Sequence, residues 1–184
     1  EKEFGRGRVL DTPVSENAVT GMGLGLALTG TNALVIHPRM DFMIYAMDPI
    51  VNAAAKWRYV LNSDLPIPLT IRAIINRGGE QGAQHSQALH SWFSHIPGLR
   101  VVMPSTVEDA YLLLRESIVS PDPVIFIEDR WDYEIESNFE PEFTRIGLEN
   151  YEPKIKLSGS EITVVGVGHT TNMILNAVQE QNDL

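Results

Sequence analysis

The chain has 184 residues, a net charge of -10 at pH 7, 43% hydrophobic residues and no cysteine. This length suits one domain with a sizeable core and part of another. The acidic balance argues against nucleic acid as a partner, and no apolar run is long enough to predict a membrane span. The lack of cysteine excludes disulfides, thiolate metal sites and cysteine nucleophiles, and a cytoplasmic protein is the default expectation.

Short apolar segments alternate with helical patterns along the first two thirds of the chain. The apolar segments have the length of buried strands, and helix-start signals follow them within a few residues. The predicted strands are residues 8–10, 33–36, 69–74, 99–103 and 123–127. The predicted helices are residues 16–28, 48–57, 86–95 and 105–119. This alternation predicts an α/β fold, a doubly wound and mainly parallel sheet with helices on both faces.

The composition changes after the fifth predicted strand. Acidic residues outnumber basic ones between Glu128 and Glu152, and apolar periodicity is lost, which predicts a surface linker. Residues 161–168 then predict a strand and residues 171–180 a helix, a pair that cannot bury its own apolar faces. This pair either docks on the first domain or opens a second, incomplete one. The expected division is a domain at 1–133, an acidic linker at 134–157 and the final unit at 158–184.

Glu16 stands in the first turn of the first predicted helix, just beyond the carboxyl end of strand 8–10. Ser15 can cap this helix, and Pro13 ends the strand. Open α/β sheets place their ligands at this edge. A first-turn carboxylate also has a plain structural explanation, because it interacts favourably with the helix dipole. Glu16 is therefore a candidate that needs support from the rest of the chain.

Two aromatic side chains are expected at the same edge of the sheet. His85 lies at the end of a glycine-rich loop and the start of a predicted helix, a common place for functional side chains. Phe42 follows strand 33–36, and a core aromatic is an equally good interpretation of it. By contrast, the glycines at 21, 23 and 25 fall inside a helix, so they favour close packing over a dinucleotide-binding loop.

Five short motifs occur in one order and at matching spacing: residues 12–16, 52–56, 83–87, 97–102 and 123–124. Together they resemble the β subunit of the thiamine-diphosphate-dependent decarboxylating component of 2-oxo-acid dehydrogenase complexes, of the pyruvate and branched-chain types. That subunit contains the pyrimidine-binding domain of the transketolase-like group. The resemblance runs from about Phe4 to Tyr133, and five motifs in register are far more specific than one.

The resemblance implies roles for the three candidate residues. Glu16 matches the glutamate that hydrogen-bonds N1′ of the cofactor's aminopyrimidine, which favours the imino tautomer that removes the thiazolium proton. Phe42 matches the aromatic residue that stacks on the pyrimidine ring. His85 matches an active-site histidine placed for proton transfers, including those of acyl transfer to a lipoyl group. The implied activity is the oxidative decarboxylation of a 2-oxo acid by a β-type subunit or a fragment of one.

The chain also departs from the family pattern. His37 and Arg39 stand where an acidic and aromatic stretch is usual, and they would face either a different substrate carboxylate or a partner subunit. A structural potassium site is implied as well, although a serine occupies one position where aspartate is common. The backbone carbonyls that match this site belong to Leu69, Ser117, Ser120 and Asp122.

The Gly-Asp-Gly…Asn motif that holds the diphosphate and its Mg²⁺ does not occur in this sequence. In the family it lies on the α subunit, so the resemblance implies an α-type partner, β2 self-association within an α2β2 assembly, and a lipoyl-bearing acyltransferase. The implied compartment is the cytoplasm, or the mitochondrial matrix in a eukaryote. Two alternatives stay open. One is a transketolase-like or acyloin-cleaving enzyme with the same cofactor, and the other is a non-catalytic structural or regulatory relative.

Overall fold

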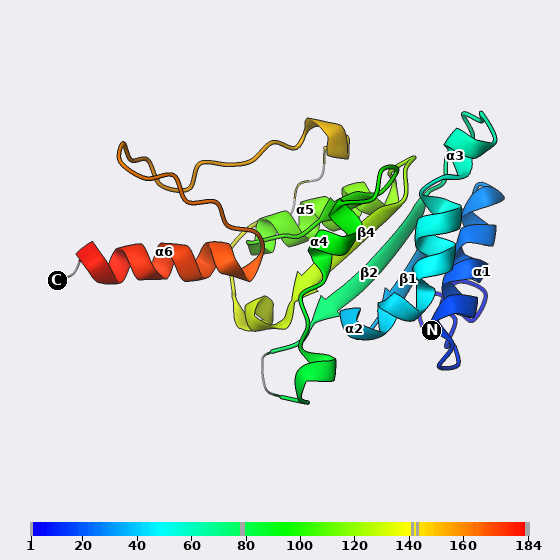
Figure 1. Cartoon of the computed structure of the whole chain (residues 1–184), viewed down its shortest axis with the longest axis horizontal. Helices are drawn as coiled ribbons and strands as arrows, with labels where there is room; N and C mark the ends of the chain where they lie inside the picture. Colours follow the sequence, from blue (N-terminus) through cyan, green and yellow to red (C-terminus); the bar gives the residue numbers. More distant parts are fainter. Residues whose placement is uncertain (1, 78–79, 141, 143, 183–184) are drawn as a thin grey trace.

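A computed structural model of the chain describes residues 2–77, 80–140, 142 and 144–182. Four parallel strands form one sheet in the order β1-β2-β4-β3. The predicted parallel α/β fold is thereby confirmed (Figure 1). The strands are β1 (Ala33–His37), β2 (Leu69–Ile75), β3 (Arg100–Val102) and β4 (Val124–Asp129).

Helices of very different lengths connect and flank these strands. Among the described residues, no helix combines the length and apolar character of a membrane span. The α-helices are α1 (Glu16–Leu28), α2 (Met40–Met43), α3 (Trp57–Val60), α4 (His90–Ser94), α5 (Val107–Ile118) and α6 (His169–Asn182). The shorter or wider turns are η1 (Ile44–Ala46), η2 (Asp48–Ala54), η3 (Ala83–His85), η4 (Arg130–Glu134) and η5 (Leu148–Asn150).

Neighbouring residues of β2 show that helices cover both faces of the sheet, as predicted. Leu69 faces α1, where Gly23 packs so closely that an added Cβ would collide with Val35 of β1. Thr70 points to the opposite face, because side chains alternate along a strand. Its hydroxyl donates a hydrogen bond of 2.8 Å to the Ser117 carbonyl of α5. The core therefore lies on both sides of β2, whose side chains are buried or half-buried along its whole length.

Two predicted helices differ from the observed ones. The helix expected at 48–57 is a π-helix, η2, in which the Ala55 amide donates to the Ile50 carbonyl five residues back at 3.0 Å. The helix expected at 86–95 is reduced to α4. Its first predicted turn is absent because the Gln87 amide donates to the Asp41 carboxylate at 3.0 Å. The predicted loop 76–82 is irregular where it is described, and Gly78 and Gly79 lie outside the described residues.

Two predicted strands, 8–10 and 161–168, are wrong. Both segments are irregular, and their apolar side chains are exposed, for example Leu10 at 60% and Val165 at 82%. A strand exists only when its backbone pairs with a neighbour, and neither segment meets one in the described part of the chain. Ser15 is the N-cap residue of α1, as predicted, but its hydroxyl makes no capping hydrogen bond. Helix α1 begins instead with the Val19 amide donating to the Ser15 carbonyl at 2.9 Å.

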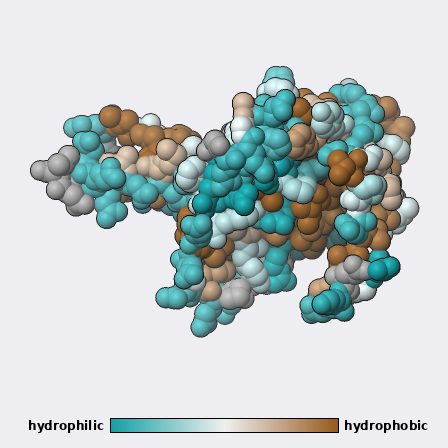
Figure 2. Space-filling model, turned by 90° about the horizontal axis from the view of Figure 1, so that it is seen from below, coloured by the Kyte–Doolittle hydropathy of each residue, from teal (hydrophilic) through white to brown (hydrophobic). Residues whose placement is uncertain are grey.

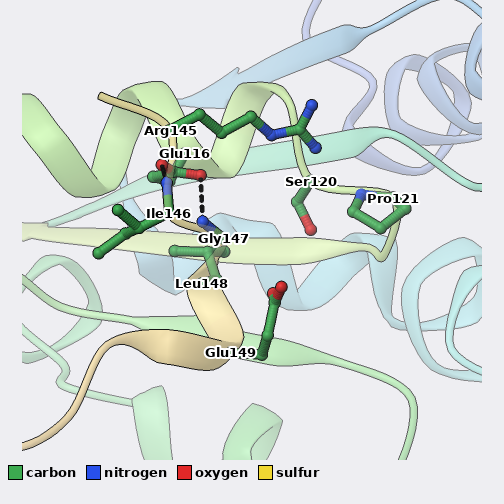
Figure 3. A pocket seen from close by; sticks show the side chains of 8 residues that line it. All are labelled: Glu116, Ser120, Pro121, Arg145, Ile146, Gly147, Leu148 and Glu149. Carbon is green, nitrogen blue, oxygen red and sulfur yellow. Dashed lines mark hydrogen bonds between the residues drawn. The ribbon is translucent and has the colours of Figure 1, made fainter. Parts of the chain in front are cut away.

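The acidic segment after the sheet is tied to α5 by one buried carboxylate. Glu116 is 1% exposed and accepts hydrogen bonds from the amides of Ile146 (2.7 Å) and Gly147 (3.2 Å), as Figure 3 shows. A cavity of about 280 Å³ lies beside this contact. Further along, the Lys154 ammonium lies 3.0 Å from the Asp109 carboxylate of α5. The segment therefore follows the surface of the sheet domain through specific contacts.

Only the start of α6 is docked on the sheet domain. His169 lies 2.7 Å from the Asp132 carboxylate, and the Asn172 amide donates to the Ser105 carbonyl at 3.1 Å. Beyond these contacts α6 points away from the sheet (Figure 1). The division of the chain at residues 133 and 157 stays a prediction. The large apolar side chains left exposed here are Ile155, Leu157, Ile162, Val164, Val165, Val167 and Met173.

The Glu116 contact gives a testable prediction. In Glu116→Ala the amides of Ile146 and Gly147 lose a charged acceptor, which is worth about 1.5–3 kcal/mol. We expect hydrogen exchange at these two amides to become at least about tenfold faster. Glu149→Ala is the matched control, since this exposed glutamate lines the same cavity. Unchanged protection of both amides in Glu116→Ala would contradict the assignment.

Candidate active site

Helix α1 brings Glu16 to the carboxyl end of β1. The helix runs back along the strand that follows it, so its N-terminus lies where β1 ends. The Thr20 hydroxyl and Nε2 of His37, the last residue of β1, are 3.0 Å apart. Glu16, one turn earlier, is partly exposed. The structure therefore places this carboxylate at the edge of the sheet where open α/β folds bind ligands.

Phe42 and His85 come together at the same edge. Phe42 lies on α2, directly after β1, and His85 ends η3, in the loop that follows β2. Their rings meet edge to face, with centroids 5.1 Å apart and planes at 78°. Both side chains are partly exposed. An aromatic ring and an imidazole are thus adjacent, although 43 residues separate them in the chain.

Tyr45 joins these two rings to the start of α1. Its ring lies parallel to that of Phe42, with centroids 6.3 Å apart, and its carbonyl accepts a hydrogen bond of 3.4 Å from the Asn17 amide group. The first turn of α1, Tyr45, Phe42 and His85 therefore form a continuous row. Figure 2 looks onto the molecule from this side and shows apolar surface between two hydrophilic projections. The sequence analysis did not identify Tyr45, although an aromatic residue one turn after Phe42 could have indicated it.

His37 lies inside the domain, beneath α1. It is 3% exposed, and burial lowers the pKa of its imidazole below the ordinary 6.5, although the nearby Glu16 carboxylate opposes the shift. His37 is therefore neutral at pH 7. The hypothesis that it faces a partner subunit is wrong for this chain, because its side chain is covered by the helix. Of the predicted pair, only Arg39 is partly exposed, and its guanidinium donates to the Gln81 side chain at 3.0 Å.

The residues suggested for potassium lie around the end of α5 and the start of β4, apart from Leu69 in β2. The Ser117 carbonyl accepts the Thr70 hydroxyl, and the Asp122 carbonyl accepts the Ser120 hydroxyl at 3.1 Å. Two guanidinium groups, from Arg58 and Arg100, lie 2.7 and 2.9 Å from the Asp122 carboxylate. Hydrogen bonds and guanidinium groups thus surround these residues, and the potassium site stays a prediction. Leu69, the fourth suggested residue, is fully buried in β2.

The row at the sheet edge fits the aminopyrimidine half of thiamine diphosphate. Glu16 offers a carboxylate oxygen to a ring nitrogen, Phe42 offers an aromatic face, and His85 offers a proton-transfer group. Nδ1 of His85 is buried and has no hydrogen-bond partner within the described part of the chain. No three metal-ligating side chains gather anywhere among the described residues. The row thus presents a carboxylate, an aromatic face and an imidazole at one edge of the sheet.

Comparison with known families agrees with this geometry. The family described as transketolase, pyrimidine-binding domain, matches residues 1–135, which include all four strands and every residue of the row. The chain belongs to this family. The pyrimidine-binding domain accounts for the sheet and its carboxyl edge, whereas the segment after residue 135 lies beyond the match.

Curated relatives of the pyrimidine-binding domain are subunits of 2-oxo-acid and acetoin enzymes. The chain is 37% identical over 180 residues to the pyruvate dehydrogenase E1 component subunit beta of Rhizobium meliloti, covering 97% of this chain and 39% of the relative. It is 36% identical to the acetoin:2,6-dichlorophenolindophenol oxidoreductase subunit beta of Bacillus subtilis, covering 99% and 53%. It is 34% identical to the 2-oxoisovalerate dehydrogenase subunit beta of the same organism, covering 97% and 54%. The resemblance predicted from the motifs is confirmed, and the chain spans about half or less of these relatives.

A solved structure supports the fold. The chain matches one described as a split gene transketolase, inactive beta4 tetramer, with a TM-score of 0.57 and 18% identity. The match covers 70% of this chain and 39% of the other. At this identity the likeness shows the transketolase-like fold alone.

The buried histidine beneath α1 predicts a pH-dependent stability. Because the pKa of His37 is lowered in the folded state, the unfolded chain binds a proton below pH 6.5 that the folded chain does not. Stability should therefore fall as the pH drops from 7 to 5, by at most about 1.4 kcal/mol per pH unit from this group. In His37→Gln this part of the fall should disappear from urea unfolding curves.

His95→Gln serves as the matched control, because His95 is exposed. The control should keep the fall in stability seen in the unsubstituted chain. The same fall in His37→Gln would show that His37 is not the group that takes up the proton.

Proposed function

We propose that this chain is the β-type subunit, or part of one, of a thiamine-diphosphate-dependent 2-oxo-acid dehydrogenase. It would supply the aminopyrimidine half of an active site that it shares with an α-type partner. The observation that carries the proposal is the row of Glu16, Phe42 and His85 at the carboxyl edge of the sheet. Similarity to pyruvate and 2-oxoisovalerate dehydrogenase β subunits supports it.

Each residue of the row has a role that follows from its surroundings. The Glu16 carboxylate, partly exposed at the start of α1, would accept a hydrogen bond from the N1′ position of the aminopyrimidine and stabilise its imino form. The Phe42 ring would lie against the pyrimidine face, and Tyr45 supports that ring from behind. His85 would hold or release a proton at its imidazole, next to Phe42. Bound thiamine diphosphate supplies the electron sink for decarboxylation of the 2-oxo acid.

The proposed partner follows from what this chain lacks and what it exposes. No Gly-Asp-Gly…Asn motif is present for the diphosphate, so Mg²⁺ and the diphosphate would be held mainly by the α-type subunit. Further along α1 than Glu16, the helix exposes Met22 (63%) and Leu26 (46%), and Gly21 and Gly25 leave open space on its surface. Such an apolar helix face suits close contact with another subunit.

The wider assembly would be α2β2, with self-association of two β-type chains. Acyl transfer to lipoyl on an acyltransferase would follow decarboxylation, by analogy with the dehydrogenase relatives. The compartment would be the cytoplasm or the mitochondrial matrix, because relatives include bacterial and mitochondrial proteins. These statements concern the whole enzyme and rest on similarity to longer proteins.

A second candidate function uses the same site. Similarity to the acetoin oxidoreductase β subunit, at 36% identity, supports an acyloin-cleaving enzyme in which the substrate differs and the cofactor does not. Assays with pyruvate, a branched-chain 2-oxo acid and acetoin would separate the two. A non-catalytic relative is disfavoured, because a structural role requires neither Glu16 nor the Phe42–His85 pair.

The test of the proposal is Glu16→Gln in an assembly with an α-type partner. We expect exchange of the thiazolium C2 proton for deuterium, followed by NMR after acid quenching, to slow by about 10²-fold or more. Glutamine accepts a hydrogen bond but cannot share a proton with N1′. Sedimentation should show the same assembly as for the unsubstituted chain.

Glu152→Gln is the matched control, since it changes an exposed glutamate outside the row. It should leave C2 proton exchange unchanged. Full exchange in the Glu16→Gln assembly would refute the assigned role of Glu16.

A further inference from the structure

The loop that carries His85 is held against α2 at three points. The Arg39 guanidinium binds the Gln81 side chain, and the Phe42 ring packs against His85. The third contact joins Asp41 to Gln87. Of Arg39, Phe42 and Asp41, which make these contacts, Asp41 is the buried residue, with 2% of its surface exposed. It lies on α2 between Met40 and Phe42.

Asp41 makes two hydrogen bonds through a single oxygen. Its Oδ1 accepts the Gln87 backbone amide at 3.0 Å and the Gln87 side-chain amide at 2.9 Å. Met40 and Met43, on either side in α2, are fully buried and fix the backbone that carries this carboxylate. Gln87 is therefore tied to a rigid part of the core.

The position of Gln87 explains why this contact matters for His85. The Ser86 hydroxyl donates to the Gly82 carbonyl at 3.1 Å and closes the turn that contains His85. Residues 86–89 are not helical, so no helix ladder holds this stretch. His85 thus lies between a local turn and the Asp41–Gln87 contact. Without the Asp41 carboxylate, the loop would keep the hydrogen bond between Ser86 and Gly82 but lose the two hydrogen bonds that hold Gln87 to α2.

We propose that Asp41 is a positioning residue for His85. Its carboxylate fixes Gln87 and so keeps the His85 imidazole edge-on against Phe42. The consequence for catalysis rests on the proposed function, whereas the positioning itself does not.

The two carboxylate oxygens of Asp41 differ in their contacts, which allows a specific test. Oδ1 carries both hydrogen bonds, whereas Oδ2 is buried and has no partner among the described residues. Asp41→Asn keeps an acceptor at the Oδ1 position and places its NH2 group where Oδ2 stands. Asp41→Ala removes the acceptor altogether. If Oδ1 is the anchor, the asparagine variant should hold the loop and the alanine variant should release it.

The test is NMR on the 184-residue chain without cofactor or partner. In Asp41→Ala we expect loss of the ring-current shift that Phe42 imposes on the His85 ring protons, and exchange of the Gln87 amide about tenfold faster or more. In Asp41→Asn both signals should stay close to those of the unsubstituted chain, within about threefold in exchange. Asp64→Ala, which changes an exposed aspartate, is the matched control and should change neither.

Two outcomes would overturn the proposal. One is an unchanged His85 shift and Gln87 exchange rate in Asp41→Ala. The other is equal loss of both signals in Asp41→Asn while the fold is intact, because Oδ1 would then not be the anchor. Since neither readout involves thiamine diphosphate, they stand even if the Glu16→Gln experiment refutes the proposed function.

In the assembled enzyme, the same variant should separate positioning from binding. Asp41→Ala should lower kcat by about tenfold while leaving the Kd for thiamine diphosphate unchanged, because Glu16 and Phe42 keep their places. If Asp41→Ala released the loop but left kcat unchanged, the claim that catalysis depends on the positioning of His85 by Asp41 would be wrong.

Discussion

The parallel pairing of β1 with β2 is the constraint on which the rest of the structure depends. Parallel strands end at the same edge of a sheet, so the residues that follow each strand meet there. Phe42 follows β1 and His85 follows β2, and their rings touch. Helix α1 runs back along β1 and brings Glu16 to the same edge, where Thr20 meets His37. A shift in this pairing would move His85, which follows β2, away from Phe42 and Glu16.

The arrangement explains why the site is open on one side. Glu16, Phe42 and His85 are each only partly buried, and Tyr45 is 66% exposed. A low dielectric strengthens a hydrogen bond between a carboxylate and a heterocycle, and this chain alone does not exclude water from the row. An active site built on these residues therefore needs a second surface that closes over it. The exposed Met22 and Leu26 of α1 offer apolar surface for contact with such a partner.

Local sequence signals predicted the elements that are defined by their own residues. Helix α1 and strands β1 and β2 lie within one residue of the predicted ranges, because their apolar periodicity and their breakers are encoded locally. The segments 8–10 and 161–168 carry the same apolar signal, but a strand also requires a neighbour that no local pattern reveals. Prediction of the site residues from sequence has the same limit. Glu16, Phe42 and His85 could be proposed from motifs, whereas Asp41 and Tyr45 gain their importance only from contacts made by folding.

The most direct test of the central claim is calorimetric binding of thiamine diphosphate with Mg²⁺. It would be measured for this chain alone, for an α-type partner alone, and for the two together. If the chain supplies half of a shared site, tight binding should occur only in the mixture, with one cofactor per pair of chains. Equally tight binding to this chain alone, or to the partner alone, would contradict the account.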